Sequence, residues 1–392
     1  MANYLNRYPV VLLHGMFGYG QQQKTEAHMP YFGLWNVHIR KMFEEQDIKT
    51  VAPSMGPFTS AWNRACEVYA QLFGGTVDYG KAHSEKFGCA RYGRTYEALL
   101  PEWGTKDEDG NLIKINIIDH SFGGVTGRLL TELMVNGSPE EQAATDPDDL
   151  SPLFAGGHKG WVHSITTLAS PHDGATCAEG AIGKVMAASC VLICDVTNLI
   201  GVTPLKDYYD LELDLYGFNP SLSKPSSLFQ HKRFKEYFAQ PDCVTYDASL
   251  KGAPEINAKL PTQSDVYYFS YRGYRTFRLP FSKNEIPSPL AFPLINVLGF
   301  FMGRQKDGCP DPSWRRNDMV INTVSGEAPA GDPRTDVPEA KVGTQYQPGI
   351  WNVYPAQFKD HMSFLGWTEK ESDFRNFYQT IYDIASTQPT VD

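Results

Sequence analysis

The distribution of apolar and polar residues along the chain predicts four short buried strands and one long helix. Apolar runs bounded by turn residues occupy residues 8–15, 113–120, 163–170 and 265–272, and each has the length and composition of a strand buried on both faces. Residues 124–137 instead show helical spacing of leucine and methionine and end at an Asn-Gly stop. Strands that alternate with helices in this way predict a mostly parallel α/β sheet.

Two stretches interrupt this alternation. Residues 52–100 are polar and rich in Gly, Tyr and His, and residues 174–262 combine an apolar helical segment with a charged, proline-bearing one. The acidic stretch 136–149 is typical of a solvated loop. The chain shows no internal repeat and no low-complexity tract, so we expect a single domain over residues 1–392 that carries insertions at about 52–100 and 174–262.

The composition narrows the choice of partners. The chain is 42% hydrophobic and 13% aromatic and has a net charge of −10, which excludes a nucleic-acid partner and favours a hydrophobic or small one. The uncharged apolar run from Val185 to Cys194 has about half the length of a bilayer span, so we expect no integral membrane segment. Seven cysteines without a CxxC pair do not indicate a disulfide scaffold. We expect a monomer that is either secreted, in which case this sequence is the mature form without its signal peptide, or cytoplasmic.

The segment "IIDHSFGGVTGRLL", residues 117–130, places a serine at the junction of a predicted strand and a predicted helix. A nucleophilic serine on such a turn has strained backbone geometry and needs small residues two positions before and after it. Gly123 meets the second requirement, whereas Asp119 breaks the first. We interpret Ser121 as a nucleophile on the strand-to-helix elbow of an α/β-hydrolase fold, rather than as an ordinary turn serine.

A nucleophilic serine needs a general base, and in this fold class an acid and then a histidine follow the serine along the chain. His361 is the only histidine after His231, and we predict that it is the base. Asp318, beside a short apolar run, is our choice for the carboxylate that orients the imidazole. Other carboxylates stay open on spacing alone: Asp307, Asp311, Asp332 and, less favoured because it adjoins the histidine, Asp360.

The stretch "HGMFGYG" follows the first predicted strand and contains three glycines. Acyl transfer needs two backbone N–H groups that face the developing oxyanion. We expect Phe122, the residue after Ser121, and Met16, in this glycine-rich loop, to supply them.

Five stretches carry a resemblance to a known family: "VVLLHGMFGYG", "RACEVYAQLFGGTVDYGKAHSEKFGCARYGRTY", "SPLFAGGHKGWVHSITTLASPHDG", "YFSY" and "NDMVINTVSG". Together they resemble the zinc-containing thermoalkalophilic bacterial lipases and their staphylococcal relatives, a group whose clostridial members also cleave polyesters. The likeness spans roughly residues 7–380. It implies an α/β-hydrolase fold with a zinc-type insertion and a helical lid insertion. It also implies a triad and an oxyanion hole at the positions chosen above: Ser121, Asp318 and His361, with Met16 and Phe122.

The resemblance further implies one zinc ion, held in the family by two Asp and two His between the insertion and the core. The matching positions here are Asn63, His83, Cys89 and Asp247, and two of them depart from the family pattern. A Cys89 thiolate is a good zinc ligand, whereas Asn63 offers only a neutral carbonyl. We expect zinc; the alternative is a metal-free set of residues joined by hydrogen bonds.

The family's calcium site is expected to be absent. Its acidic ligands fall here on Ser363 and Thr368, followed by Glu369. A neutral hydroxyl in each carboxylate position leaves too little negative charge for a hard cation.

Two apolar stretches are candidates for contact with the substrate. Residues 181–201 have a broad helical apolar stripe, and the resemblance implies that they form a lid; the alternative is a permanently buried core helix. Residues 289–303 suit either an acyl-binding wall or a buried segment. We therefore predict a serine carboxylic-ester hydrolase of lipase type that acts on a hydrophobic ester or at a lipid or polymer interface. The alternative, favoured by Asp119 and the altered metal positions, is a catalytically weakened or silent relative that binds lipid or a partner.

Overall fold

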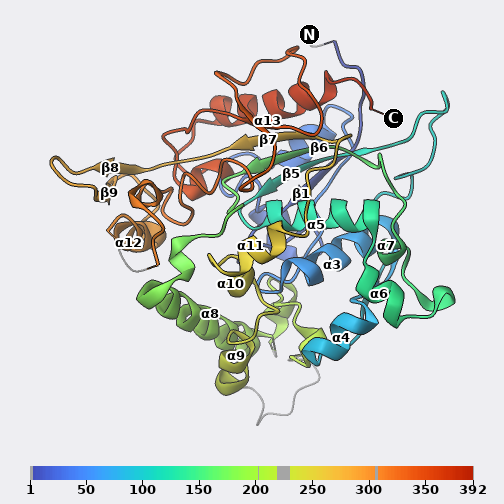
Figure 1. Ribbon diagram of the computed structural model, residues 1–392, viewed down its shortest axis with the longest axis horizontal. Coiled ribbons are helices and arrows are strands. Elements are labelled where there is room, and N and C mark those ends of the chain that lie inside the picture. The colour runs from blue at the N-terminus through green and yellow to red at the C-terminus, as the bar shows by residue number, and fades with distance from the viewer. Residues whose placement is uncertain (1–2, 202, 219–229, 305–307, 392) are drawn as a thin grey trace.

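The computed structural model describes residues 3–201, 203–218, 230–304 and 308–391, and its centre is a seven-stranded sheet (Figure 1). All neighbouring strands in this sheet are parallel, in the order β10-β11-β7-β6-β5-β1-β2. The four predicted strands are confirmed as β1, β5, β6 and β7, which lie side by side. The sheet strands are β1 Val10–Leu13, β2 Thr50–Val51, β5 Ile115–His120, β6 Val162–Leu168, β7 Tyr267–Tyr271, β10 Arg334–Asp336 and β11 Trp351–Val353.

Helices cover both faces of the sheet. The predicted helix over residues 124–137 is confirmed as α5, but the acidic stretch 136–149 is not simply a loop, because it contains α6. The Ser138 hydroxyl accepts the N–H of Glu141 and Pro139 occupies the first turn, so this short helix has a regular N-terminal cap. The helices are α1 Lys24–His28, α2 Ile39–Glu44, α3 Ala61–Phe73, α4 Lys81–Phe87, α5 Gly123–Asn136, α6 Pro139–Ala144, α7 Pro152–Ala155, α8 Gly180–Ile200, α9 His231–Tyr237, α10 Val244–Asp247, α11 Gly252–Asn257, α12 Pro293–Met302 and α13 Glu371–Ser386.

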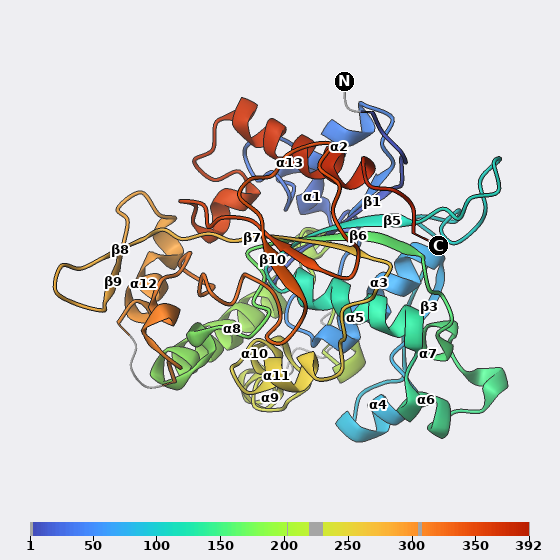
Figure 2. The same ribbon diagram turned by 45° about the horizontal axis from the view of Figure 1, so that its top comes forward.

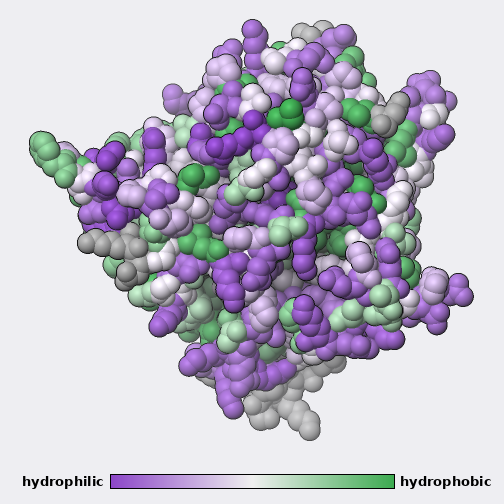
Figure 3. Space-filling model, viewed as in Figure 1, coloured by the Kyte–Doolittle hydropathy of each residue, from purple (hydrophilic) through white to green (hydrophobic). Residues whose placement is uncertain are grey.

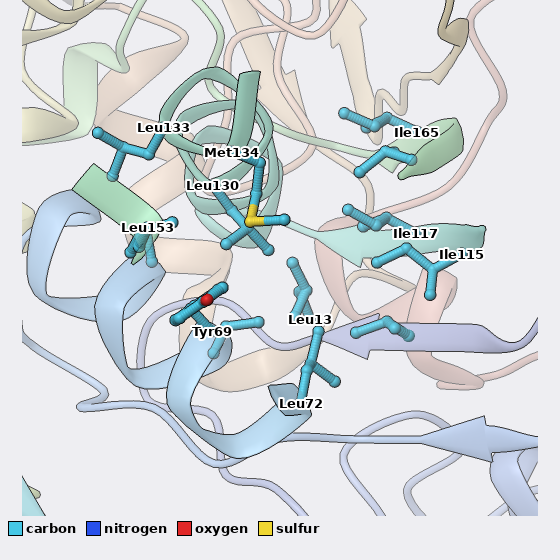
Figure 4. Packing of buried hydrophobic residues seen from close by; sticks show 14 of the residues in the cluster. Leu13, Tyr69, Leu72, Ile115, Ile117, Leu130, Leu133, Met134, Leu153 and Ile165 are labelled. Carbon is cyan, nitrogen blue, oxygen red and sulfur yellow. The ribbon is translucent and has the colours of Figure 1, made fainter. Parts of the chain in front are cut away.

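The core lies in two layers, one on each face of the sheet. Successive strand residues point to opposite faces, so Ile117 and Ile118 of β5 enter different layers. Ile117 packs with Leu130 of α5 and with side chains of α3 (Figure 4). Ile118 packs with Tyr378 of α13 and with side chains of α2 on the other face (Figure 2). This covering on both faces explains why the central strands are continuous apolar runs.

The two insertions build the side of the molecule below the α3 and α5 layer in Figure 1. The first contains α3, α4 and an antiparallel hairpin of β3 (Gly75–Asp78) and β4 (Tyr92–Tyr96). The second contains α8 to α11. Helix α3 packs against α5 as part of the core layer, so the region 52–100 is only partly peripheral.

The apolar helix α8 lies largely exposed. Within its most apolar 18-residue window only 28% is buried, so it is not the permanently buried core helix of our alternative interpretation. It is the one described helix with the length and composition of a membrane span. The uncharged run from Val185 to Cys194 is too short to predict such a helix, because α8 extends beyond that run to include Lys184 and Asp195. One such helix is weak evidence for a span. Asp195 is buried and accepts a hydrogen bond from His231 Nδ1 of α9 at 2.8 Å, so α8 packs on α9 within the second insertion.

The second apolar stretch forms α12, and this helix also has an exposed apolar face rather than a buried one. Beside it projects a hairpin of β8 (Thr276–Arg278) and β9 (Glu285–Pro287), at the left of Figure 1.

Candidate active site and metal centre

Ser121 lies on the sharp turn between β5 and α5. Its φ of +58° is in the left-handed region that non-glycine residues rarely adopt. Glycine is required at two neighbouring positions: a Cβ on Gly123 would lie 2.3 Å from the carbonyl oxygen of Leu13, and a Cβ on Gly15 would lie 2.5 Å from the Cβ of Ser121. A strained serine packed this closely against the end of the first strand has the backbone geometry of a nucleophile elbow.

Asp119 is completely buried under this turn. Its Oδ1 accepts the Ser170 hydroxyl at 3.0 Å, whereas its Oδ2 has no hydrogen-bond partner among the described residues. Burial raises the pKa of Asp119 well above its usual range, against the opposing effects of the Ser170 hydrogen bond and the Arg128 charge. Room for the carboxyl comes from α5, since a Cβ on Gly124 would lie 2.7 Å from Asp119 Oδ1. Gly124 on α5 thus provides the space that a small residue at position 119 of β5 would otherwise provide.

His361 and Asp318 form a buried pair. His361 Nδ1 lies 2.9 Å from Asp318 Oδ2, and the His361 N–H donates to the Asp318 carbonyl at 2.8 Å. Asp318 Oδ1 accepts the backbone N–H groups of Val320 and Ile321 at 3.0 and 2.6 Å. The carboxylate is therefore fixed by hydrogen bonds from its own loop and from the imidazole, and it can orient that ring and stabilise a positive charge on it.

The other carboxylates considered for this role have different partners. Asp360 accepts the N–H groups of Ser363 and Phe292. Asp311 caps the short 3-10 turn after it, Asp332 accepts the Thr262 hydroxyl, and Asp307 lies outside the described residues.

His120, which precedes Ser121, connects the two halves of the site. The Gly15 N–H donates to Tyr31 Oη at 3.0 Å, Tyr31 Oη lies 2.8 Å from His120 Nδ1, and His120 Nε2 lies 3.0 Å from the carbonyl oxygen of His361. All three bonds are satisfied together when Tyr31 donates to Nδ1 and His120 is neutral with its proton on Nε2. Burial lowers the pKa of His120 well below its usual range, which favours that neutral form.

The His120 and His361 rings lie 4.4 Å apart, which places the His361 loop beside the serine turn. The hydrogen bonds of the described residues do not include one between Ser121 and His361, and such bonds often form only with substrate. The role of Tyr31 could not be predicted, because nothing in the sequence relates Tyr31 to the elbow.

The backbone N–H groups of the two expected oxyanion donors have no acceptor among the described residues. Neither Met16 nor Phe122 donates its backbone N–H to another described residue. Phe122 is the N-cap of α5, so the positive end of the helix dipole also faces this region. Two unpaired N–H groups beside a strained serine suit a developing negative charge.

A second group of side chains lies between the insertions. One ligand atom from each of His83, Cys89 and Asp242 lies within 4.8 Å of the other two, and His83 Nε2 is 3.0 Å from Asp242 Oδ2. Asn63 Nδ2 lies 3.3 Å from the same Asp242 oxygen, and Asn63 Oδ1 is buried without a hydrogen-bond partner among the described residues. Trp62 stacks on the His83 ring. The four groups come from α3, α4, the segment just after α4 and the segment before α10, and their N, S and O atoms could hold a metal ion.

The prediction that Asp247 is a metal ligand is wrong. Its Oδ2 accepts the N–H of Ala61 at the start of α3, at 2.8 Å, and Asp242 lies with His83 and Cys89 instead. Both aspartates belong to the stretch "PDCVTYD", and only the tertiary packing distinguishes them.

Around the expected calcium positions, Ser363 bonds to Asp360 and Glu369 pairs with Lys359, so these groups have partners within the chain.

The parallel sheet and the turn at Ser121 define a fold of the α/β-hydrolase class. The chain matches the family described as "Lipase-like, C-terminal domain" over residues 6–388, and it belongs to that family. It is 32% identical to Lipase 2 of Staphylococcus aureus strain MRSA252 over 394 residues and 29% identical to Lipase 1 of S. aureus strain NCTC 8325 over 405 residues. These alignments cover 96% and 100% of this chain but 53% and 56% of the relatives, so the chain spans about half the length of the curated relatives it matches.

Solved structures agree with this assignment. The lipase of Staphylococcus hyicus superposes with a TM-score of 0.83 at 28% identity, covering 98% of this chain and 96% of that one. Lipase 1 of Pelosinus fermentans gives a TM-score of 0.79 at 35% identity, with coverages of 97% and 99%. EstA of Clostridium botulinum gives 0.80 at 31% identity, with coverages of 100% and 90%. The expected fold class and family resemblance are confirmed.

Proposed function

We propose that this chain is a serine carboxylic-ester hydrolase of lipase type with the triad Ser121, His361 and Asp318. The hydrogen bond from His361 to a fully buried Asp318, on a loop that contacts the residue before a strained Ser121, is the observation that carries the proposal. Membership of the lipase-like family and the named lipase relatives support the same reaction class.

In this mechanism His361 Nε2 removes the proton from Ser121 Oγ as that oxygen attacks the ester carbonyl. The carbonyl oxygen becomes an oxyanion, which accepts the N–H groups of Met16 and Phe122. His361 then protonates the leaving alcohol, and Asp318 stabilises the imidazolium in between. Water attacks the acyl-enzyme with the same imidazole as base, which releases the acid and restores the serine.

The triad is tested by labelling with a fluorophosphonate probe and by hydrolysis of a soluble p-nitrophenyl ester. We expect the wild-type chain to be labelled and Ser121→Ala not to be labelled, and we expect that variant to lose kcat by a factor on the order of 10⁶. Ser170→Ala is a matched control, because this serine is also buried near the elbow but points to Asp119. Absence of labelling in the wild-type chain would favour a silent relative that binds lipid, and faster turnover of the matching anilide would favour an amidase.

We propose that the substrate is a hydrophobic ester, in lipid or in a polyester. The exposed apolar faces of α8 and α12 support this choice, because a soluble protein seldom exposes contiguous apolar area without a binding role. Comparison of short-chain esters, triacylglycerol emulsions and a polyester film separates the substrate classes. A preference for short, charged esters would contradict the proposal.

We also propose that His83, Cys89, Asp242 and Asn63 hold a structural zinc ion. Burial raises the pKa of the Cys89 thiol to about 12, so the group is neutral until a cation lowers that pKa and makes it a thiolate ligand. The unpartnered Asn63 Oδ1 is a further available donor. The ion would join α3 and α4 of the first insertion to the second insertion.

Elemental analysis of the purified protein tests this site, with one zinc per chain as the expected result. Cys89→Ser should lower the zinc content and the Tm together, whereas Cys309→Ser, at a half-exposed cysteine outside the group, should change neither. A metal-free wild-type protein whose Tm does not respond to a chelator would show that the four residues are joined by hydrogen bonds alone.

A further inference from the structure

One face of the molecule exposes an unusual number of large apolar side chains. Leu294, Val297 and Phe301 recur at helical spacing along one face of α12, and all three are exposed. Phe281, at the end of the β8–β9 hairpin, is fully exposed. We call this the hairpin surface, and its exposed apolar residues are Phe277, Phe281, Leu290, Leu294, Val297, Phe300 and Phe301.

The backbone conformation at Phe281 is strained. Its φ is +55°, in the left-handed region where glycine or asparagine would be less strained. In Figure 3 the end of the projecting hairpin is hydrophobic, and hydrophilic residues gather directly behind it. A strained, fully exposed aromatic residue at the tip of a hairpin indicates a binding role, since no burial within the described chain stabilises it there.

The charge of this surface is opposite to that of the chain. Between residues 274 and 316 the described residues include six Lys or Arg and two Asp or Glu, in a chain with a net charge of −10. Arg278, Lys283 and Arg316 are exposed and line a groove of about 680 Å³ together with Phe277. Among the described residues none of these three cations forms an ion pair with a carboxylate, although Glu285 lies opposite Arg278 in the hairpin register.

Cations and aromatic rings alternate closely on this surface. The guanidinium of Arg304 lies 3.7 Å from the ring centre of Phe300, and that of Arg316 lies 3.5 Å from the ring centre of Tyr274. Aromatic rings and long cationic side chains of this kind occupy the boundary between lipid headgroups and acyl chains. The hairpin surface therefore combines an apolar tip with cationic side chains and aromatic rings close to it.

The hairpin surface is also fixed to the loops of the candidate active site. Asn317, next to Asp318, donates to the Gly299 carbonyl of α12 at 3.3 Å. Asp360, next to His361, accepts the N–H of Phe292 at the start of α12 at 2.9 Å. A partner bound to this surface would thus lie beside the triad.

We propose that the hairpin surface docks the protein onto an anionic lipid surface. Phe281 and the exposed face of α12 enter the apolar boundary, and Arg278, Lys283 and Arg316 lie at the level of the lipid phosphates. The charge argument separates this partner from a neutral lipid, and the measurement of vesicle binding and oligomeric state separates it from a second copy of this acidic chain. The inference rests on the proposed function for its biological context, but the binding itself needs no turnover.

Binding is measured in the Ser121→Ala background, so that no lipid is hydrolysed, by co-sedimentation with vesicles. Vesicles of phosphatidylcholine alone are compared with vesicles that also contain phosphatidylglycerol. We expect tighter binding to the anionic vesicles, and weaker binding in about 0.5 M NaCl because salt screens the cations. Phe281→Ser should weaken binding about ten-fold. Arg278→Gln with Lys283→Gln should weaken it about 30-fold and remove the preference for anionic lipid.

Matched controls lie elsewhere on the surface. Leu5→Ser changes an exposed apolar residue near the N-terminus, and Lys41→Gln with Lys49→Gln removes two exposed cations at and after α2. Neither control should alter vesicle binding. In the Ser121 chain, Phe281→Ser should leave hydrolysis of a soluble ester unchanged, so loss of docking and loss of the proposed activity are separate results.

Equal binding to both kinds of vesicle would overturn the proposal, as would a Phe281→Ser variant that binds as well as Leu5→Ser. A wild-type dimer that ignores vesicles and dissociates in Phe281→Ser would identify a second copy as the partner instead, and would also overturn it.

Discussion

Replacing Asp119 with alanine is expected to change how stability depends on pH. Complete burial raises the pKa of this carboxyl in the folded protein, whereas in the unfolded chain it ionises near about pH 4. Between these two pKa values the folded state keeps a proton that the unfolded state releases. The free energy of unfolding of the wild-type chain therefore contains a contribution that is full below about pH 4 and is lost as the pH rises toward the folded pKa.

The size of the effect follows from proton linkage. Each pH unit between the two pKa values lowers the free energy of unfolding of the wild-type chain by about 1.4 kcal/mol relative to a variant without the carboxyl. The variant leaves the Ser170 hydroxyl without its acceptor, which costs about 1 kcal/mol at every pH. We expect Asp119→Ala to be about 1 kcal/mol less stable than wild type below about pH 4, and to gain about 1.4 kcal/mol on wild type for each pH unit above that until the folded pKa is reached.

The assay is urea unfolding followed by tryptophan fluorescence at a series of pH values. Asp119→Asn is the matched control, because it does not titrate but keeps an oxygen acceptor for Ser170. Both variants should diverge from wild type with the same slope as the pH rises. A difference that does not depend on pH would refute the reasoning, since it would mean that Asp119 is ionised in the folded protein and stabilised by Arg128.

The same position is expected to influence catalysis. Asp119 occupies the place of a small residue under the elbow, and its buried carboxyl lies beside the turn that carries Ser121. We predict that Asp119→Gly raises turnover of a soluble ester. Unchanged turnover would show that the carboxyl has no effect on the serine.

The remaining predictions concern the two sites. Asp318→Asn should lower kcat by about 10⁴-fold with little change in KM, because the imidazole loses its orientation and charge partner; a loss in KM alone would contradict this. Tyr31→Phe removes the hydroxyl bonded to His120 and should lower kcat about ten-fold without loss of folding, as judged by circular dichroism. Asp242→Asn should reduce the zinc found by elemental analysis, whereas Asp247→Asn should not, and the reverse result would restore Asp247 as the ligand.

Much of the fold could be predicted because its signals are local. The central strands are buried on both faces, so each is a continuous apolar run, and α5 shows its buried face through residue spacing. The acidic stretch resembles a loop in its composition, because α6 is short and the cap at Ser138 is surrounded by other polar residues. The apolar residues of α12 do not disclose whether they face the core or the solvent, since both environments can use the same composition.

Some residues of the candidate site could also be predicted from the sequence, whereas the environment of others could not. Ser121 and His361 could be chosen from order and scarcity along the chain, and Asp318 from its position between them. Asp119 looked incompatible with the elbow, because the room that Gly124 leaves for its carboxyl becomes apparent only when strand and helix are packed together.

By itself the sequence determined the four central strands, α5 and the membership of a lipase-like family, and it supplied the candidates for the nucleophile and base of the proposed triad, because these follow from local patterns and from residues in a set order. The tertiary structure alone decided that Asp242 rather than Asp247 meets His83, that Tyr31 and His120 connect Gly15 to the His361 loop, and that α12 is joined to the loops that carry Asp318 and His361. Each of these depends on contacts between segments far apart in the chain, and the packing of the sheet with its helices sets those contacts.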